Sequence, residues 1–284
     1  MKRFGDRRDG KLIRKIDSMH YIMPLIYPNR CDNEAFFRAT IDLTAIDEYL
    51  KKKNENNPEY PYKLFQVIVA AALKTITLRP QMNRFICNNN LYQRNHVNAA
   101  FTVKKIFSDE GGETLARIEC TAEDTLESIH DKVFKQVSFC KKHNDQSTDA
   151  MDVVQKLPFK HAIGSVVRFL DRHGWMPAPV VATDPYTCSI VLANIGSLKI
   201  DAPFHHLTNW GTTSIFCSVG LIKKRPFFDE EGNVTMKNSV ELDLTIDERI
   251  ADGYYYSKTL RLLEKLLNNP ELLDQPFGTP VDLE

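Results

Sequence analysis

The chain has 284 residues, of which 43% are hydrophobic and 26% charged, a balance typical of a globular protein with a sizeable core. Lysine plus arginine number 37, and aspartate plus glutamate also number 37. This neutral balance excludes the strong overall field that would indicate nucleic acid or an anionic membrane as a partner, so we expect no nucleic-acid partner.

The six cysteines stand singly, without the spacing of a metal site or the density of a secreted disulfide scaffold. They indicate reduced thiols and therefore a cytoplasmic protein. Charged residues fill the N-terminus, where a signal peptide would need an apolar stretch. No apolar run approaches the roughly 20 residues of a membrane span, so we expect no such span.

The first half of the chain predicts a mixed order of strands and helices, not the strict alternation of a doubly wound sheet. Residues 1–34 form an arm in which Pro24 and Pro28 argue against a continuous helix. Thr44, with Asp47 three residues later, is interpreted as the N-cap of a helix. The expected elements are a strand over 36–43, that helix, a buried helix over 63–78 before Pro80, hairpins over 83–95 and 96–120, the second turning at 109–113, and a helix over 123–143.

Residues 146–186 are less regular and contain two helical stretches separated by Pro158. The second stretch has apolar residues at helical spacing, namely Ala162, Ile163, Val166, Val167, Phe169 and Leu170. We interpret it as a helical insertion packed on the domain or on another subunit, and the alternative is an apolar lid or a membrane-surface contact. The rest predicts strands over 187–196 and 212–222, a hairpin turn over 227–235, a strand over 237–246 and a helix from Tyr254 to Leu267.

The loop D-E-R-I-A-D-G at 247–253 lies between a predicted strand and a predicted helix, a common place for a catalytic side chain. Arg249 and Asp252 are expected to pair as a rigid brace. Gly253 would permit a positive φ or a close approach in such a turn. The brace would hold Glu248, either as a catalytic base or as a structural carboxylate near Arg249.

This loop resembles the motif D-H-R-x-x-D-G of the dihydrolipoyl acyltransferase core of 2-oxoacid dehydrogenase complexes, in the superfamily of chloramphenicol acetyltransferase. Four positions match, and Glu248 stands where the family has its histidine; the matching residues are Asp247, Arg249, Asp252 and Gly253. The motif is moderately specific, and the elements that precede it occur in the family's order.

The stretch I-V-L-A-N-I-G at 190–196 resembles the family's T-I-S-N-L-G turn. Asn194, Ile195 and Gly196 match, and Ala193 replaces the serine that stabilises the oxyanion in the family. The resemblance covers roughly residues 35–145 and 187–274. It implies an N-terminal arm over 1–34 and a single catalytic domain over 35–284 with a helical insertion at about 146–186.

The implied fold is α/β, an α+β two-layer sandwich with one mixed sheet flanked by helices. The implied assembly is a homotrimer, with a larger cage possible. Coenzyme A and a small-molecule acceptor would meet in a channel between subunits, without a metal. Because the chain begins almost at the core, we expect no lipoyl domain of its own.

Both usual catalytic side chains are replaced. A carboxylate near pKa 4.3 is about four units below a thiol near 8.5, a deficit of roughly 5 to 6 kcal/mol for a base, although burial can raise a carboxyl pKa by about 3 to 5 units. His205 and His206 are alternative bases, or else ordinary loop histidines. Ser197 and Ser218 are candidates for the missing oxyanion donor.

The run Lys223-Lys224-Arg225 is a candidate for contacts with the phosphates of coenzyme A, or a solvated end of a strand. The sequence therefore predicts a protein that transfers an acyl group between coenzyme A and an unknown small acceptor. The alternative is a catalytically inactive trimeric scaffold or ligand-binding module of the same fold, because the histidine and the serine are both absent.

Overall fold

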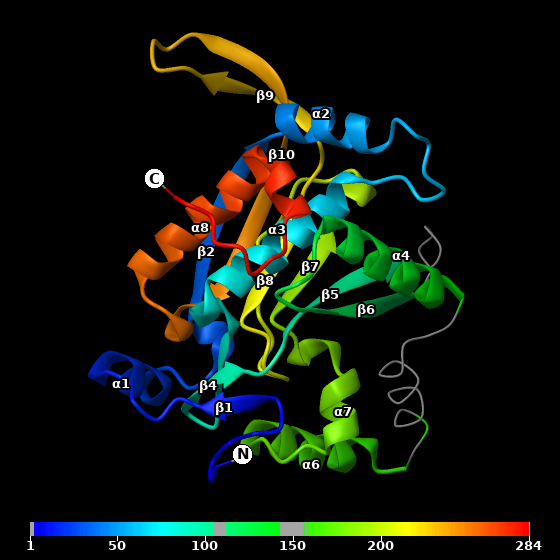
Figure 1. The fold of residues 1–284 in the computed structure, drawn as a ribbon. Helices are drawn as coiled ribbons and strands as arrows, with labels where there is room; N and C mark the ends of the chain where they lie inside the picture. Colours follow the sequence, from blue (N-terminus) through cyan, green and yellow to red (C-terminus); the bar gives the residue numbers. More distant parts are fainter. Residues whose placement is uncertain (1–2, 105–111, 143–155, 157, 284) are drawn as a thin grey trace.

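The structure, a computed structural model, describes residues 3–104, 112–142, 156 and 158–283. A mixed sheet forms the centre of the molecule (Figure 1), with the strand order β2-β10-β8-β7-β5-β6. Its strands are β2 Glu34–Asp42, β5 Val97–Lys104, β6 Glu113–Cys120, β7 Ile190–Asn194, β8 Ile215–Val219 and β10 Val234–Asp247. β7 is parallel to β5 and to β8, whereas β2, β8 and the short strand β9 (Lys223–Phe228) pair antiparallel with β10.

One face of this sheet is covered by helices that supply the main hydrophobic core (Figure 1). The helices are α2 Thr44–Lys53, α3 Leu64–Leu78, α4 Leu126–Lys142 and α8 Gly253–Asn268. Along β10, Leu242, Leu244 and Ile246 alternate toward these helices, as the period of two in a strand requires. The two-layer fold predicted from the sequence is confirmed.

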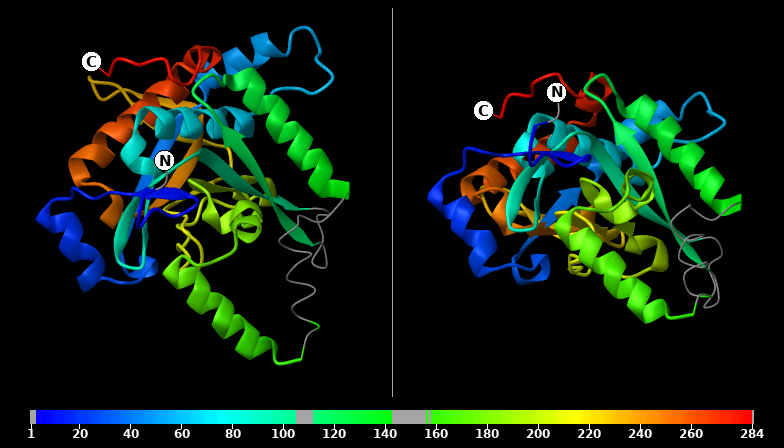
Figure 2. Two further views of the ribbon diagram at one scale, coloured as in Figure 1. Left: turned by 60° about the horizontal axis from the view of Figure 1, so that its bottom comes forward. Right: turned by 90° about the horizontal axis from the view of Figure 1, so that it is seen from below.

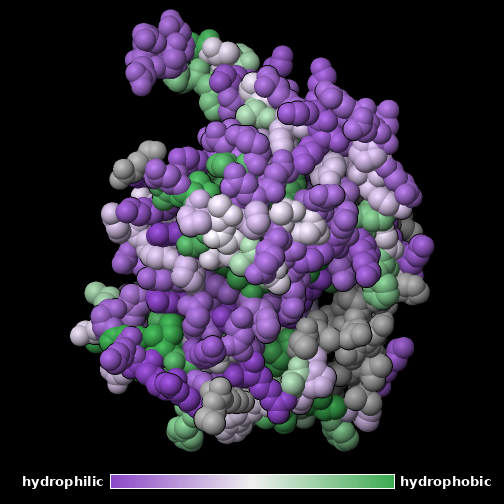
Figure 3. All heavy atoms as spheres, in the orientation of Figure 1, coloured by the Kyte–Doolittle hydropathy of each residue, from purple (hydrophilic) through white to green (hydrophobic). Residues whose placement is uncertain are grey.

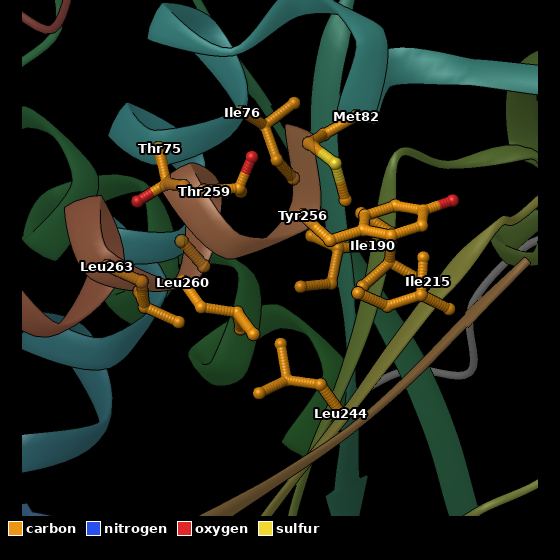
Figure 4. Close-up of a pocket in the computed structure, with 12 residues that line it drawn as sticks. Thr75, Ile76, Met82, Ile190, Ile215, Leu244, Tyr256, Thr259, Leu260 and Leu263 are labelled. Carbon is orange, nitrogen blue, oxygen red and sulfur yellow. The ribbon is translucent and has the colours of Figure 1, made fainter. Parts of the chain in front are cut away.

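A small void lies in this core between α3, α8 and the sheet (Figure 4). Its volume is about 30 Å³, and its wall is apolar except for the hydroxyl-bearing residues Thr75, Thr259 and Tyr256. A space of that size holds a water molecule or two, not a substrate. The functional site must therefore lie elsewhere.

A second sheet, of strand order β1-β4-β3, ties the N-terminal arm to the body of the protein. Its strands are β1 Gly10–Leu12, β3 Arg84–Cys87 and β4 Asn90–Arg94, and the adjoining helical segments are α1 Ser18–Ile26, η1 Arg30–Asp32 and η2 Pro80–Asn83. The arm is not one continuous helix, as expected, although Pro24 lies inside α1, where the amide of Tyr27 still closes the last turn on Met23. The predicted N-cap at Thr44 was wrong: Asp42 accepts the hydrogen bond from the Thr44 amide at 2.9 Å.

The segment predicted to be an insertion contains α6 Lys160–His173 and α7 Ala178–Thr183, and η3 Pro185–Thr187 follows. Figures 1 and 2 place α6 at the end of the molecule near β1, away from α2 and the β9–β10 hairpin. The first predicted helical stretch of the insertion and most of the turn at 109–113 lie outside the described residues. In the part of the chain that is described, no helix has both the length and the apolar character needed to cross a membrane.

Candidate functional site

A cavity of about 690 Å³ opens on the sheet face opposite α8 and extends toward α3 and α4. β5 and β7 pair only from Ala99 to Phe101 against Ile190 to Leu192. Beyond that point β5 remains paired with β6 alone, so the sheet parts between β5 and β7. The cavity is lined there by these strands, by η4 Ile195–Leu198 and by the loop that follows η4.

The end of β7 places the predicted oxyanion region beside the cavity. Ala193, Asn194 and Ser197 all line it. The Ser197 hydroxyl donates to the Asn194 carbonyl at 2.7 Å, and the Asn194 side chain accepts from the Ser197 amide at 3.3 Å. Gly196 is required here because a Cβ atom would lie 2.2 Å from the carbonyl oxygen of Gly220.

Ser218 lies directly beside Ala193, because these two residues are partners in the parallel pairing of β7 and β8. Its side chain is fully buried, and its hydroxyl has no hydrogen-bond partner among the described residues. The next strand places Asp243 opposite Ser218, and Asp243 is engaged by Arg38 at 2.6 and 2.7 Å. A hydroxyl without a partner among the described residues therefore lies one strand away from Ala193, the position at which the resemblance implies a serine.

His205 and His206 line the same cavity as Ala193. The His205 ring stacks on Phe216 with centroids 4.0 Å apart and planes 6° apart, and it also stacks on His206 at 4.5 Å. Its Nδ1 lies 2.8 Å from the carbonyl oxygen of His206. Because a carbonyl can only accept, Nδ1 carries the proton, which leaves Nε2 of the neutral ring with a free lone pair.

Glu248 is exposed and does not line this cavity. It begins the short helix η5 Glu248–Ile250, where its amide donates to the Asn33 carbonyl at 2.8 Å. Within one chain, the structure therefore brings the histidine pair and Ala193 together but leaves Glu248 apart from them.

The loop around Glu248 is braced, but not by the predicted pair of Arg249 and Asp252. Arg249 binds Asp247 through Nε at 2.8 Å and Nη2 at 2.7 Å, and both residues are buried. Asp252 instead caps α8 by accepting from the Tyr255 amide at 2.7 Å. Gly253 needs no special backbone conformation, since its φ is not positive and a Cβ atom would meet nothing within 4 Å.

Asp247 also faces a second buried arginine, Arg30, whose Nε lies 3.6 Å from Oδ2. Arg30 donates to the carbonyl oxygens of Thr208 at 2.6 Å and Gly211 at 3.2 Å. Burial lowers the pKa of Arg30, and the charge of Asp247 opposes this effect. Arg30 thus joins the N-terminal arm both to the carboxylate of Asp247 and to the loop that carries His205.

The basic run at the start of β9 lies away from the cavity and is partly neutralised. Lys223 pairs with Asp201 at 2.7 Å, and Arg225 pairs with Glu241 at 2.9 Å. Lys224 is exposed. The cavity has two lysines of its own that the sequence did not single out, Lys104 and Lys141.

Asp184 is a third residue that sequence reasoning missed. Its carboxylate, buried beside the cavity, accepts from the Tyr186 amide at 2.9 Å and from the Trp210 indole at 2.7 Å. Burial raises the pKa of Asp184, partly offset by these two donors. The dipeptide Asp-Pro at 184–185, a common start of a short helix, was the available signal.

Comparison with known proteins finds a family match over part of the chain. Residues 184–274 match the model of the 2-oxoacid dehydrogenases acyltransferase catalytic domain. The resemblance predicted from the sequence is confirmed. This acyltransferase resemblance in sequence covers close to a third of the chain, whereas the structural similarity covers nearly all of it. A search of curated proteins found no match.

Among solved structures, the acyltransferase-like fold is similar to a probable dihydrolipoamide acetyltransferase from Listeria monocytogenes, with 14% identity and a TM-score of 0.58 over 91% of this chain and 95% of that one. It is similar to the cubic core of the pyruvate dehydrogenase multienzyme complex, with 11% identity and a TM-score of 0.61 over 92% and 93%. It is also similar to chloramphenicol acetyltransferase, with 11% identity and a TM-score of 0.52 over 91% and 99%.

Proposed function

We propose that this protein transfers an acyl group between coenzyme A and a small acceptor in the cytoplasm, with His205 as the general base. The observation that carries the proposal is the position of His205. Its Nδ1 is held by the His206 carbonyl, and its ring lines the cavity that Ala193 also lines. An imidazole fixed in this tautomer presents a basic Nε2 to a bound reactant.

The free-energy cost of taking a proton from a thiol favours a histidine over a glutamate as the base. An ordinary imidazole near pKa 6.5 is about two units below a thiol near 8.5, a deficit of about 2.7 kcal/mol. An ordinary glutamate carries a deficit of about 5.7 kcal/mol on the same scale. Glu248 is exposed and does not line the cavity, so within one chain it is not placed beside a reactant bound there.

In the proposed reaction, Nε2 of His205 takes the proton of the acceptor hydroxyl or thiol as its oxygen or sulfur attacks the thioester carbonyl. The tetrahedral intermediate then collapses, the bond to the coenzyme A sulfur breaks, and the imidazolium returns the proton to that sulfur. The mainly apolar wall of the cavity supports the exclusion of water from this step. Lys104 and Lys141 are the proposed contacts for coenzyme A phosphates, in preference to Lys223, Lys224 and Arg225.

The oxyanion has lost its usual donor at Ala193. Ser197 is a weaker replacement because its hydroxyl proton is already given to the Asn194 carbonyl. Ser218 is the better one, since its hydroxyl has no partner among the described residues and it is in register with Ala193. Because Ser218 is buried and does not line the cavity, its use requires a rearrangement around β8 when substrate binds.

We further propose a homotrimer in which Glu248 of one subunit faces the cavity of the next, with assembly into a larger cage possible. Two observations support this assembly. Glu248 is exposed, and the nearby helix α1 exposes Met19, Leu25 and Ile26 at 64%, 52% and 56%. The similar cubic core of the pyruvate dehydrogenase complex is itself a large assembly. The competing function is an inactive trimeric scaffold, favoured by the joint replacement of histidine and serine.

Calorimetric titration of coenzyme A and acetyl-coenzyme A, followed by an acyl-transfer assay with a broad acceptor panel, tests the proposal. We expect saturable binding, and turnover that His205→Gln lowers by about 100-fold or more, the usual range for a general base. The matched variant His206→Gln should keep most of the activity. Binding without turnover would support the scaffold, and equal activity of both variants would remove His205 as the base.

A further inference from the structure

The rest of the chain buries only part of the apolar face of helix α6. Of its residues, Asp171 is buried, and Ile163, Val167 and Leu170 are half-buried against the body. Val166 and Phe169 remain exposed at 58% and 52%. At about 100° per residue these two lie on the outward side of the helix, so its apolar face continues well beyond what the chain itself covers.

An aromatic cluster extends this exposed face at the C-terminal end of α6. The rings of Phe169 and His173 lie 4.1 Å apart, and Phe169 meets Trp175 edge-on at 5.8 Å. Trp175 is 64% exposed, and Phe159 just before the helix is 84% exposed. Aromatic side chains at the edge of an apolar face are typical of the membrane–water interface.

The charged residues in and around α6 are mostly positive. Residues 156–183 contain four lysines and arginines but a single acid, Asp171, in a chain whose total charge is zero. Asp171 is buried and accepts from the Gly211 amide at 3.0 Å, so it does not offset the outward charge. Arg168 and Arg172 are both exposed.

The N-terminal arm adds more positive charge next to α6. Residues 1–15 contain seven lysines and arginines and two acids. Arg7 joins this arm to the end of α6, because its Nη1 lies 2.9 Å from the Cys87 sulfur and within van der Waals reach of Gly174. Figure 3 shows hydrophobic and hydrophilic surface side by side along the edge where Figure 1 places α6.

We propose that this end of the molecule, formed by α6 with Trp175 and by the basic residues 3–15 that precede α1, binds the surface of a membrane that contains anionic lipids. The helix lies in the plane of the membrane, with Val166, Phe169 and Trp175 among the headgroups and Arg168 and Arg172 against lipid phosphates or carboxylates. Apolar contact and positive charge together are what an interfacial helix needs. A second copy of this chain fits less well, because two such faces would repel each other.

Co-sedimentation with vesicles tests this proposal on the full chain. We expect binding to vesicles of equal parts phosphatidylcholine and phosphatidylserine, weak binding to phosphatidylcholine alone, and loss of binding at high salt. Reversing both charges in Arg168→Glu/Arg172→Glu should weaken binding by more than about 25-fold, since each basic residue near an anionic surface is worth about a factor of five.

The matched control is Lys51→Glu/Lys52→Glu on α2, which makes the same charge change at exposed positions at the far end of the molecule. Trp175→Ser should also weaken binding, whereas Phe228→Ser, at an aromatic residue 71% exposed on β9, should not. Circular dichroism would show that each variant is folded.

Three outcomes would overturn the proposal. The first is equal binding by the α6 and α2 double variants, and the second is equal binding to vesicles with and without phosphatidylserine. The third is an absence of vesicle binding together with an oligomer, seen by light scattering, that Trp175→Ser dissociates. That last result would assign α6 to a contact between subunits.

Discussion

Replacing Asp247 with asparagine is expected to lower the free energy of unfolding by about 3 to 5 kcal/mol, the usual loss when one partner of a buried ion pair is removed. Asp247 is fully buried, and Arg249 is only 2% exposed. Their two contacts, at 2.7 and 2.8 Å, are those of a bidentate pair. The asparagine would leave the guanidinium of Arg249, and that of Arg30 at 3.6 Å, without a compensating charge.

The matched control is Asp252→Asn. Asparagine and aspartate are comparable N-caps, so the hydrogen bond to the Tyr255 amide survives and the change should stay within about 0.5 kcal/mol. Equilibrium urea unfolding of the three proteins gives both values. If Asp252→Asn were the more damaging variant, the brace would involve Asp252 and the pairing described above would be wrong. The double variant Asp247→Asn/Arg249→Met should recover part of the loss, because it removes the unpaired charge.

Three further outcomes follow from particular contacts. Thr75→Val should stabilise the fold by about 1 kcal/mol in thermal unfolding, because the Thr75 hydroxyl is buried without a partner among the described residues (Figure 4); a loss of stability would mean that a buried water satisfies this hydroxyl. Ala193→Ser should raise the acyl-transfer rate about tenfold or more by restoring an oxyanion donor, and an unchanged rate would place the oxyanion elsewhere. Burial raises the pKa of Asp184, so the contribution of this residue to stability falls as pH rises above about 4. The free energy of unfolding of the wild type, relative to that of Asp184→Asn, should therefore fall over the same pH range. A difference that stays constant with pH would show that the pKa of Asp184 is not shifted by folding.

The sequence predicted the sheet, its flanking helices and the resemblance to an acyltransferase domain, because period-two spacing, helical spacing and short motifs are local properties of the chain. It failed where a side chain had two possible partners. The spacing of Arg249 and Asp252 suggested a pair, but Asp252 precedes α8 and is used as its N-cap. Asp247 is the last residue of β10 and is thereby directed toward Arg249. The rule for N-caps was available in the sequence and would have favoured this outcome.

The register between strands was a second feature that could not be predicted from the sequence. Nothing in the sequence shows that Ser218 pairs with Ala193, because the two strands are separated by a long loop. Nor does the sequence show that His205 donates its Nδ1 proton to the neighbouring carbonyl, which decides which nitrogen can act as a base. Both facts depend on how β7, β8 and the loop between them pack.

The two candidate bases, His205 and Glu248, differ in whether they would need an assembled protein to act. His205 shares a cavity with Ala193 in a single chain, so the role proposed for it does not require oligomerisation. Glu248 is exposed and can reach a cavity only in another subunit, so any catalytic effect of Glu248 requires an assembled protein. Dilution to monomers would therefore abolish a contribution of Glu248 while leaving the cavity of His205 intact. The order in which activity and assembly are lost on dilution thus distinguishes the two residues without a substitution at either.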